Sequence, residues 1–546
     1  MHRAALLALV VAALVGGLRW PALAMVALAA VGGLAGGPRT PAETPEPVTR
    51  GERLALAAVV AAFLATTLPL LDPDRPLGTD WMAYLKNALA IATGDPALYQ
   101  KWRGPVHAWA SLAATPLVGG LVEGSQLVSV VSATALIPLT WLLGRSLFGA
   151  RVALVAAALV AGWADLRVYA VASTPYPFVA ALTTAGGAAL ALGAGAATPG
   201  GFAATHAAAA ILLGLAYGAD LRGGAAAVLM VVGAALLPGL TRVRAVALAL
   251  VGVSALGLGG AAIASAPVTL IPLHAQILLQ RDLNAREGVG PGEVRVCPAR
   301  GPAWPRPDDL YGPCGRATLA RNLSAANQAI PIGAAAAALL VGLGLLWAPK
   351  GRALLGLPLL PALPAMLIIG VQHRYVVPIA PSLALLVAVA LTRLAGGSRF
   401  APGLRVALVA LLAAAWQLWP GGFWAGAVRG SGVDPAFSLT HPPTYPSARR
   451  ALRAANDADR VVDCTHADFR VRLYPHPVER IAGGPPDRPS RRCSQLLTAG
   501  APAGTWLLVE LAAHVPQSPR WDTVVRAPIA GTAELRVLRG TSRAPR

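Results

Sequence analysis

Residues 124–170 read GSQLVSVVSATALIPLTWLLGRSLFGARVALVAAALVAGWADLRVYA. Two apolar runs, at 124–143 and 152–170, flank a short turn that carries Arg145 and Arg151. Each run is close to the length of about 20 residues that a helix needs to cross the hydrocarbon core of a bilayer. The stretch therefore predicts two helices that cross a membrane in opposite directions around a basic turn.

The same alternation continues along the chain, which is 55% hydrophobic and only 13% charged. Soluble proteins carry about 25% charged residues. The other apolar runs are 53–71, 174–194, 205–219, 223–240, 245–271, 329–347, 353–371, 376–392 and 406–424, with shorter ones at 4–17 and 21–36. We therefore predict an α-helical polytopic membrane protein with about 11–13 transmembrane helices.

The basic residues predict the orientation, because positive loops stay in the cytoplasm. These loops hold Arg39, Arg50, Arg53, Arg145, Arg151, Arg242, Arg244, Lys350, Arg352, Arg393, Arg399 and Arg405. The loops 72–123 and 272–328, the turn at 372–375 and the tail after Trp424 then face outward. We expect a multi-pass protein of the plasma (inner) membrane.

Three regions follow from this pattern. Residues 1–52 form an apolar hairpin and a cytoplasmic linker, with a cleaved signal peptide as the alternative for its first part. Residues 53–424 form the transmembrane body, and residues 425–546 form an extracytoplasmic α/β domain. For this domain we expect a helix at 445–456 and strands at 460–464, 505–510, 523–527 and 534–539.

The net charge of +20 is scattered over the loops and the tail. Nucleic-acid-binding proteins gather such charge on one face or stripe, so we predict no nucleic-acid partner. The four cysteines fall as Cys297 with Cys314 in one outward loop and Cys464 with Cys493 in the tail. Even numbers in an oxidising compartment predict two disulfides, against the alternative of four free thiols.

We predict no metal and no cofactor. Neither cysteine pair has the spacing of zinc ligands. A polar group in the tail, Asp463, His466, Asp468 and His476, matches no metal template, and solvated strand edges explain it better.

The outward segment Gly78–Gly94 reads GTDWMAYLKNALAIATG and is the first candidate for chemistry. As a helix it places Asp80, Tyr84 and Asn87 on one side and apolar residues on the other. Such a helix would lie in the membrane interface, where Asp80 can take a proton from an acceptor hydroxyl or amine. The alternative is that Thr79 or Asp80 only caps the helix.

Two further outward segments carry cations. The segment 94–109 places Lys101, Arg103 and His107 among Tyr99, Trp102 and Trp109. These cations suit a phosphate headgroup, or they form an anchoring belt with the aromatic residues.

The turn that contains His373, Arg374 and Tyr375 comes directly before a span. Arg374 at this depth suits a phosphate partner, because an unpaired arginine there is costly. The alternative is that it reaches out to the lipid headgroups.

Two aspartates end spans on the outward side. Asp165 precedes Arg167, and Asp220 precedes Arg222, so each pair can form a local ion pair. Either aspartate is also a candidate second acidic group. Asp165 ranks higher because the aromatic and proline-rich turn 173–177 follows it.

Three stretches resemble a known family. They are DWMAY at 80–84, RGPVH at 103–107 with the later turn GRSLFGAR at 144–151, and HRYVVPIAP at 373–381. Their order and spacing resemble the GT-C superfamily of polytopic glycosyltransferases, of the mannosyltransferase and aminoarabinose-transferase type. The resemblance covers residues 53–424. Trp81 stands where the family often has a second acid, so the acid–base role falls on Asp80 alone or needs a partner such as Asp165.

The resemblance implies transfer of a sugar from a polyprenyl-phosphate monosaccharide to a lipid, glycan or protein acceptor on the outer face of the membrane. Asp80 would activate the acceptor, and Arg374 with Lys101 or Arg103 would stabilise the leaving phosphate. The alternatives are a lipid-linked sugar transporter, a non-catalytic envelope scaffold, or a glycan polymerase or ligase. Nearly charge-free spans argue against the transporter.

Overall fold

The computed structural model describes residues 47–71, 79–196, 198–237, 240–271, 334–348, 351, 353–359, 376–397, 452, 459–465, 478–481, 489–512, 517–530 and 533–541. The chain divides into two compact units, which are treated separately below. The larger unit comprises the described parts of Met1–Leu70, Gln100–His107 and Val128–Val433, and the smaller unit those of Leu71–Tyr99, Ala108–Leu127 and Asp434–Arg546.

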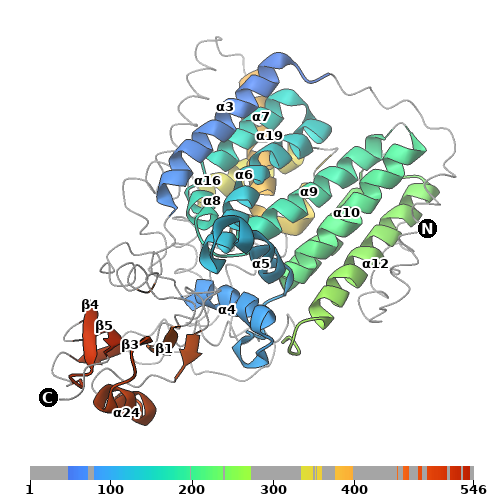
Figure 1. Cartoon of the computed structure of the whole chain (residues 1–546). Coiled ribbons are helices and arrows are strands. Elements are labelled where there is room, and N and C mark those ends of the chain that lie inside the picture. The colour runs from blue at the N-terminus through green and yellow to red at the C-terminus, as the bar shows by residue number, and fades with distance from the viewer. Residues whose placement is uncertain are drawn as a thin grey trace, which may run out of the picture. The chain divides into compact units, whose positions relative to one another are not determined.

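The membrane body is a bundle of helices (Figure 1). Its helices are α3 (Arg50–Thr67), α6 (Leu121–Phe148), α7 (Ala150–Ala161), α8 (Ala164–Ala170), α9 (Tyr176–Gly195), α10 (Pro199–Ala219), α11 (Leu221–Ala235), α12 (Arg242–Ala264), α16 (Ala334–Trp347) and α19 (Ala380–Gly397), with 3-10 turns at Leu68–Leu70 and Val377–Ile379. Within the described residues, six helical segments are long and apolar enough to cross a membrane. The prediction of a polytopic helical protein is confirmed.

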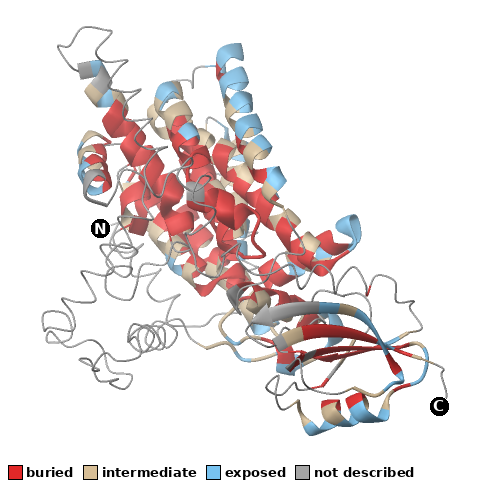
Figure 2. Ribbon diagram, turned by 90° about the vertical axis from the view of Figure 1, so that its left-hand side faces the viewer, coloured by how far each residue is buried: buried red, intermediate tan, exposed pale blue. Residues whose placement is uncertain are grey.

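The outer surface of the bundle is apolar as well as its core. Leu54, Leu339 and Leu346 are more than half exposed, whereas a soluble monomer seldom exposes large apolar areas. Figure 2 shows that buried residues dominate the central helices. A bundle that is apolar on both its inside and its outside is built for a lipid surrounding.

Small residues set the spacing of the helices. Helix α10 packs between α9 and α12 (Figure 1). A Cβ placed on Gly214 would lie 2.9 Å from the Leu258 side chain, and one placed on Gly259 would lie 2.8 Å from the Gly214 carbonyl oxygen. Glycine at both positions therefore allows the two backbones to approach closely, as is common between helices in membranes.

One predicted span is broken. The run 152–170 forms α7, which ends at Ala161, and the separate helix α8. Gly162 disfavours the helix interior, and the following Trp163 has an extended backbone (φ −82°, ψ 119°) and a buried ring. The expected continuous span is therefore two helices, α7 of 12 residues and α8 of 7 residues, separated by a break at Gly162 and Trp163.

Arg145 lies in the last turn of α6 and not in the loop that follows it. Its Nε donates to Glu52 Oε1 over 3.2 Å, and its guanidinium lies 5.8 Å from the centre of the Trp141 ring. Glu52 also completes a capping box with Thr49 at the start of α3. Because the charge of Arg145 is compensated, the helix continues past the arginine as far as Phe148.

The C-terminal part of the smaller unit is an α/β fold. Its sheet has the order β2-β1-β3-β5-β4. The strands are β1 (Arg460–Cys464), β2 (Val478–Arg480), β3 (Thr505–Ala512), β4 (Trp521–Ala530) and β5 (Ala533–Gly540), and the helix is α24 (Arg491–Ala499). Strand β1 pairs in parallel with β2 and β3, and the other pairs are antiparallel.

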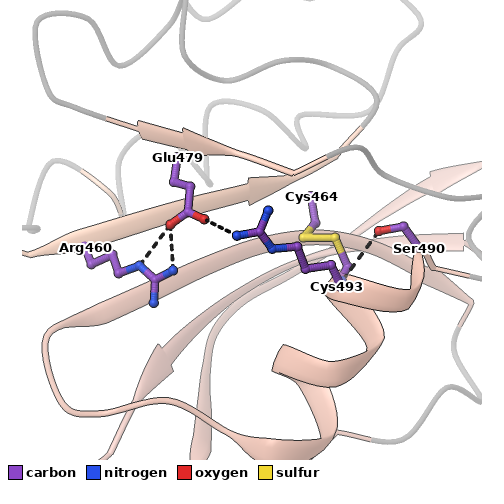
Figure 3. Close-up of polar contacts among 6 residues, drawn as sticks. Arg460, Cys464, Glu479, Ser490 and Cys493 are labelled. Carbon is purple, nitrogen blue, oxygen red and sulfur yellow. Dashed lines mark hydrogen bonds and ion pairs between the residues drawn. A yellow bond between two sulfur atoms is a disulfide. The ribbon is translucent and has the colours of Figure 1, made fainter.

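The α/β prediction for the tail is confirmed, with all four expected strands present. The short strand β2 and the helix α24 were not expected from the sequence, and of the expected helix at 445–456 only Leu452 is described. A disulfide joins Cys464 on β1 to Cys493 on α24, as predicted (Figure 3). Cys297 and Cys314 lie outside the described residues.

Beside this disulfide, Glu479 accepts from Arg460 over 2.6 Å and lies 3.7 Å from Arg492 (Figure 3). Both arginine side chains are more than half exposed, so the pairs contribute little to stability. Asp463 was expected at a solvated strand edge, and this was wrong. It lies on the inner strand β1, is fully buried, and accepts hydrogen bonds from the Thr465 backbone N–H and hydroxyl.

Candidate functional site

The segment 78–94, which is predicted to face outward, contains helix α4 (Thr79–Thr93), as the sequence predicts. Asp80 lies in its first turn, and its side chain is outside what the structure describes. Tyr84 and Asn87 are almost fully buried, and so are Trp81 and Leu85 on the opposite side. The helix is therefore packed on both sides, whereas the sequence predicts an amphipathic helix that lies in the membrane interface.

A polar contact explains how Asn87 is tolerated in this interior. Its side chain hydrogen-bonds the Tyr99 hydroxyl, which follows the 3-10 turn Pro96–Leu98. Burial raises the pKa of Tyr99 well above its ordinary value, and the bond to Asn87 opposes only part of that rise. Tyr99 therefore stays protonated and ties α4 to the segment after it.

In the larger unit, the segment that carries Lys101 and Arg103 is fixed to the ends of two long helices. The Ile271 backbone N–H, beyond the end of α12, donates to the Lys101 carbonyl over 2.8 Å. A Cβ on Gly104 would overlap the carbonyl of Gly218, near the end of α10. Lys101 is exposed and Arg103 half-buried, so both cations are held at one end of the bundle.

His107 begins helix α5 (Val106–Val118), which is too short to cross a bilayer. Its ring is 1% exposed and lies edge-on to Phe178, with 5.9 Å between ring centres. Burial lowers the pKa of His107 to about 3. The imidazole is therefore neutral at physiological pH, and its role in substrate binding stays a prediction.

Asp165 and Arg167 lie on α8 and are both buried, at 0% and 5% exposure. Tyr169, on the same helix, packs edge-on against Tyr176 at the start of α9, with 5.6 Å between the ring centres. Ser129 on α6 donates to the Thr174 carbonyl over 3.1 Å, which fixes the turn before α9. A fully buried carboxyl group at the end of the bundle keeps Asp165 as a candidate acidic group.

The second aspartate forms the local ion pair that the sequence predicts. Arg222 donates from Nε to Asp220 Oδ1 over 2.9 Å and from Nη2 to Oδ2 over 2.7 Å. Asp220 also caps α11 by accepting from the Arg222 backbone N–H. The guanidinium lies 5.6 Å from the centre of the Tyr176 ring, so α11 and the start of α9 meet at this end.

Asp220 is also close to Arg103. Burial by itself would raise the pKa of the Asp220 carboxyl, but the charge and hydrogen bonds of Arg222 and the charge of Arg103 hold it below its ordinary value. Asp220 is therefore ionised, paired with Arg222 and within electrostatic reach of Arg103. Sequence reasoning named Arg222 only as the ion-pair partner of Asp220, and the same sequence Ala-Asp-Leu-Arg occurs twice, at 164–167 and 219–222.

Three predicted substrate-binding residues cannot be placed. His373, Arg374 and Tyr375 are outside the described residues, directly before the turn that opens α19. Among the residues that are described, no group of three or more His, Cys, Asp or Glu side chains could hold a metal ion.

Comparison with known proteins gives structural likeness only. No protein-family model matches the chain, and no curated protein matches it. A crystal structure of ArnT from Cupriavidus metallidurans bound to undecaprenyl phosphate has a TM-score of 0.50 at 16% identity, over 90% of this chain and 98% of that one. The apo structure of the same protein has a TM-score of 0.48 at 15% identity, over 89% and 98%.

An oligosaccharyltransferase from Archaeoglobus fulgidus is a more distant match, with a TM-score of 0.43 at 14% identity, over 78% of this chain and 60% of that one. At these sequence identities only the architecture can be compared, and we base that comparison on the ArnT complex with undecaprenyl phosphate. The chain has the polytopic fold of ArnT with a C-terminal α/β domain, and the fold expected from the GT-C resemblance is confirmed.

Proposed function

We propose that this protein is a membrane glycosyltransferase that moves a sugar from a polyprenyl-phosphate monosaccharide to a lipid, glycan or protein acceptor on the outer face of the membrane. The observation that carries the proposal is the likeness in fold, over nearly the whole of both chains, to an ArnT structure that contains undecaprenyl phosphate. The motifs at 80–84, 103–107, 144–151 and 373–381 support the same reading.

In the proposed reaction an acceptor oxygen or nitrogen attacks the anomeric carbon, and the bond from that carbon to the phosphate oxygen breaks. The acceptor proton goes to the Asp80 carboxylate, which acts as general base. Asp165 is the proposed second acidic group. The bonding electrons leave with the phosphate, and the product is the glycosylated acceptor and free polyprenyl phosphate.

Cations are needed where charge develops. The phosphate of the donor is a diester with one negative charge, and the leaving monoester carries up to about two. We assign stabilisation of that charge to Arg374 with Lys101 or Arg103. Tyr84, Asn87, His107, His373 and Tyr375 are the remaining proposed substrate-binding residues.

In this proposal the charge on the leaving phosphate is stabilised by side chains and not by a metal ion. Transfer measured before and after dialysis against EDTA tests that part, and the expected result is an unchanged rate. Loss of activity that added divalent metal restores would contradict it.

Asp80→Asn tests the general base. We expect transfer from a polyprenyl-phosphate sugar to fall by roughly 100-fold or more, the usual contribution of a positioned base. The matched control is Asp95→Asn, because Asp95 lies in the same outward segment and only caps a 3-10 turn through Ala97, a role that asparagine also fulfils. Full activity in Asp80→Asn would remove the assigned base.

Arg374→Ala tests the phosphate role. We expect KM for the donor to rise more than KM for the acceptor, because only the donor carries the phosphate. Arg393→Ala, which removes an exposed arginine near the end of α19, is the matched control. Equal effects on both substrates would favour a structural role for Arg374.

The sugar and the acceptor class are open to a direct measurement. Mass spectrometry of envelope glycans and lipids from cells without this protein should show the loss of one sugar. An unchanged glycan profile together with accumulation of a lipid-linked sugar on the inner leaflet would favour the transporter instead.

A further inference from the structure

Helix α3 is the least buried of the six described helical segments that are long and apolar enough to cross a membrane. Only 11% of its most apolar stretch is buried, whereas 50% or more of that stretch is buried in each of the other five. Its buried residues are Glu52, Phe63 and Thr67, and it packs mainly against α7 (Figure 1). The opposite side of α3 is exposed along its whole length.

This exposed side is one continuous apolar face. The residues that form it, which we call the α3 face, are Leu54, Ala58, Ala61, Ala65 and Leu68. They follow one another at intervals of four and three, so they lie in one row along the helix. All five are exposed, with Leu54 at 60% and Leu68 at 47%.

The side chains of the α3 face suit a neighbouring helix better than lipid. The most exposed apolar residues on other helices of the bundle are large, as at Val131, Val246 and Leu339. The middle of the α3 face holds only alanines. Helices associate in membranes through such small side chains, because their backbones can then approach closely.

The chain itself supplies a neighbour at a fixed point. The Thr49 backbone N–H donates to Glu52 Oε2 over 2.7 Å, and the Glu52 backbone N–H donates to Thr49 Oγ1 over 3.1 Å. Glu52 is held in turn by Arg145. The chain before Thr49 therefore enters α3 at a fixed position, at one end of the α3 face.

Residues 1–46 lie outside the described residues, and they contain the apolar runs 4–17 and 21–36. Residues 37–49 link the second run to α3 and include four prolines. Such a linker extends by about 3.1 Å per residue, so it spans at most roughly 40 Å. A tether of this length gives the two runs an effective concentration near α3 in the millimolar range.

The two runs also need a protein neighbour. As helices they would be roughly 21 and 24 Å long, shorter than the hydrocarbon core of about 30 Å. Association with other helices is one way in which short apolar segments adapt to a thicker bilayer. Nine of the 16 residues in 21–36 are alanine or glycine, so this run allows the same close approach as the α3 face.

We propose that the runs 4–17 and 21–36 remain part of the mature protein as a helical hairpin, and that this hairpin docks on the α3 face with 21–36 antiparallel to α3. The α3 face is then an internal interface of the membrane body and not a lipid-facing surface. This inference does not depend on the proposed transferase activity.

Photochemical cross-linking in cell membranes identifies the neighbour directly. The full-length protein carries p-benzoylphenylalanine in place of Ala61, and the cross-linked peptides are identified by mass spectrometry. We expect links to residues 4–36. The matched control places the same group at Ile211, an exposed residue in the middle of α10, and should give no such link. Links from position 61 only to lipid, or to a second copy of the chain, would overturn the proposal.

Cleavage of the linker measures the strength of docking. With a protease site inserted after Glu43, the cleaved N-terminal fragment should stay bound to the rest of the protein in mild detergent. Ala61→Leu should weaken this association about tenfold, because it overpacks the interface. Ala204→Leu makes the same change at an exposed alanine of α10 and should have no effect.

Melting curves in detergent identify the variants that remain folded. Equal retention of the fragment by folded Ala61→Leu and by the unaltered protein would contradict docking on the α3 face. Intact mass of the purified protein should include residues 4–36. A mature protein that begins after Ala24 would mean that a signal peptide is removed, and the proposal would then be wrong.

Discussion

At the scale of residues, the sequence Ala-Asp-Leu-Arg occurs twice in this protein and has a different local structure in each place. In Ala219–Arg222 the aspartate precedes the helix and caps it, and the arginine folds back onto its carboxylate. In Ala164–Arg167 the cap is Trp163, and Asp165 lies two positions beyond the cap inside the helix, fully buried. The local sequence predicts an ion pair in both places, but the surrounding packing determines whether the aspartate caps a helix or lies buried inside one.

His107 gives a prediction about pH. Its pKa is about 3 in the folded protein, because the ring is buried, against about 6.5 when it is unfolded and solvated. Below pH 6.5 the unfolded chain therefore takes up a proton that the folded protein does not, and folding stability falls with falling pH. Between pH 6.5 and pH 5 this linkage costs about 2 kcal/mol.

Melting temperatures of the purified protein and of His107→Gln at pH 7.5, 6.5 and 5 test this. Both proteins share every other titrating group, so the unaltered protein should lose more stability over that range than the variant. Parallel curves would mean that the imidazole is accessible to protons in the folded state.

At the scale of elements, two neighbouring glycines of α12 differ in their surroundings. Gly259 lies against α10, and Gly260 does not. A Cβ on Gly259 would overlap the Tyr217 ring, whereas one on Gly260 meets nothing within 4 Å. We expect Gly259→Ala to destabilise the protein by about 1–3 kcal/mol through overpacking. Gly260→Ala should be neutral, or stabilising by up to about 1 kcal/mol, since alanine favours the helix.

The two neighbouring substitutions are matched in chemistry and differ only in orientation. Thermal unfolding in detergent measures both. An equal loss of stability would show that backbone flexibility matters at these positions, and not the approach of α10 to α12.

The break between α7 and α8 shows why hydropathy alone misplaces element boundaries. The run 152–170 is apolar throughout apart from Asp165 and Arg167, and an average over it predicts one span. The backbone turns at Gly162 because Trp163 packs into the interior. A side chain that fits a distant neighbour can interrupt a helix that local propensity would continue.

At the scale of the whole molecule, the distribution of arginine predicts the orientation in the membrane. Ala97 lies in the loop that is predicted to face outward, and Gly200 lies in the first turn of α10, on the side predicted to be cytoplasmic; both are exposed. In intact cells, Ala97→Cys should react with a membrane-impermeant maleimide. Gly200→Cys should react only after the membrane is permeabilised.

The unaltered protein is the control, because it measures any reaction of its own cysteines. The described pair Cys464 and Cys493 is disulfide-bonded. If Gly200→Cys is labelled in intact cells and Ala97→Cys is not, the orientation is opposite to the predicted one. Asp80 would then lie on the cytoplasmic side, where the proposed reaction does not take place.

The sequence by itself determined that this is a helical membrane protein with an α/β tail and a disulfide between Cys464 and Cys493. Apolar length, strand alternation and cysteine pairing are local properties that one chain displays without its neighbours. The tertiary structure alone decided that Arg222 lies over Tyr176, that Gly104 packs against Gly218 and that Arg103 comes within electrostatic reach of Asp220. Those relations join residues far apart in the chain, and their energies depend on burial and distance, which exist only once the helices have packed.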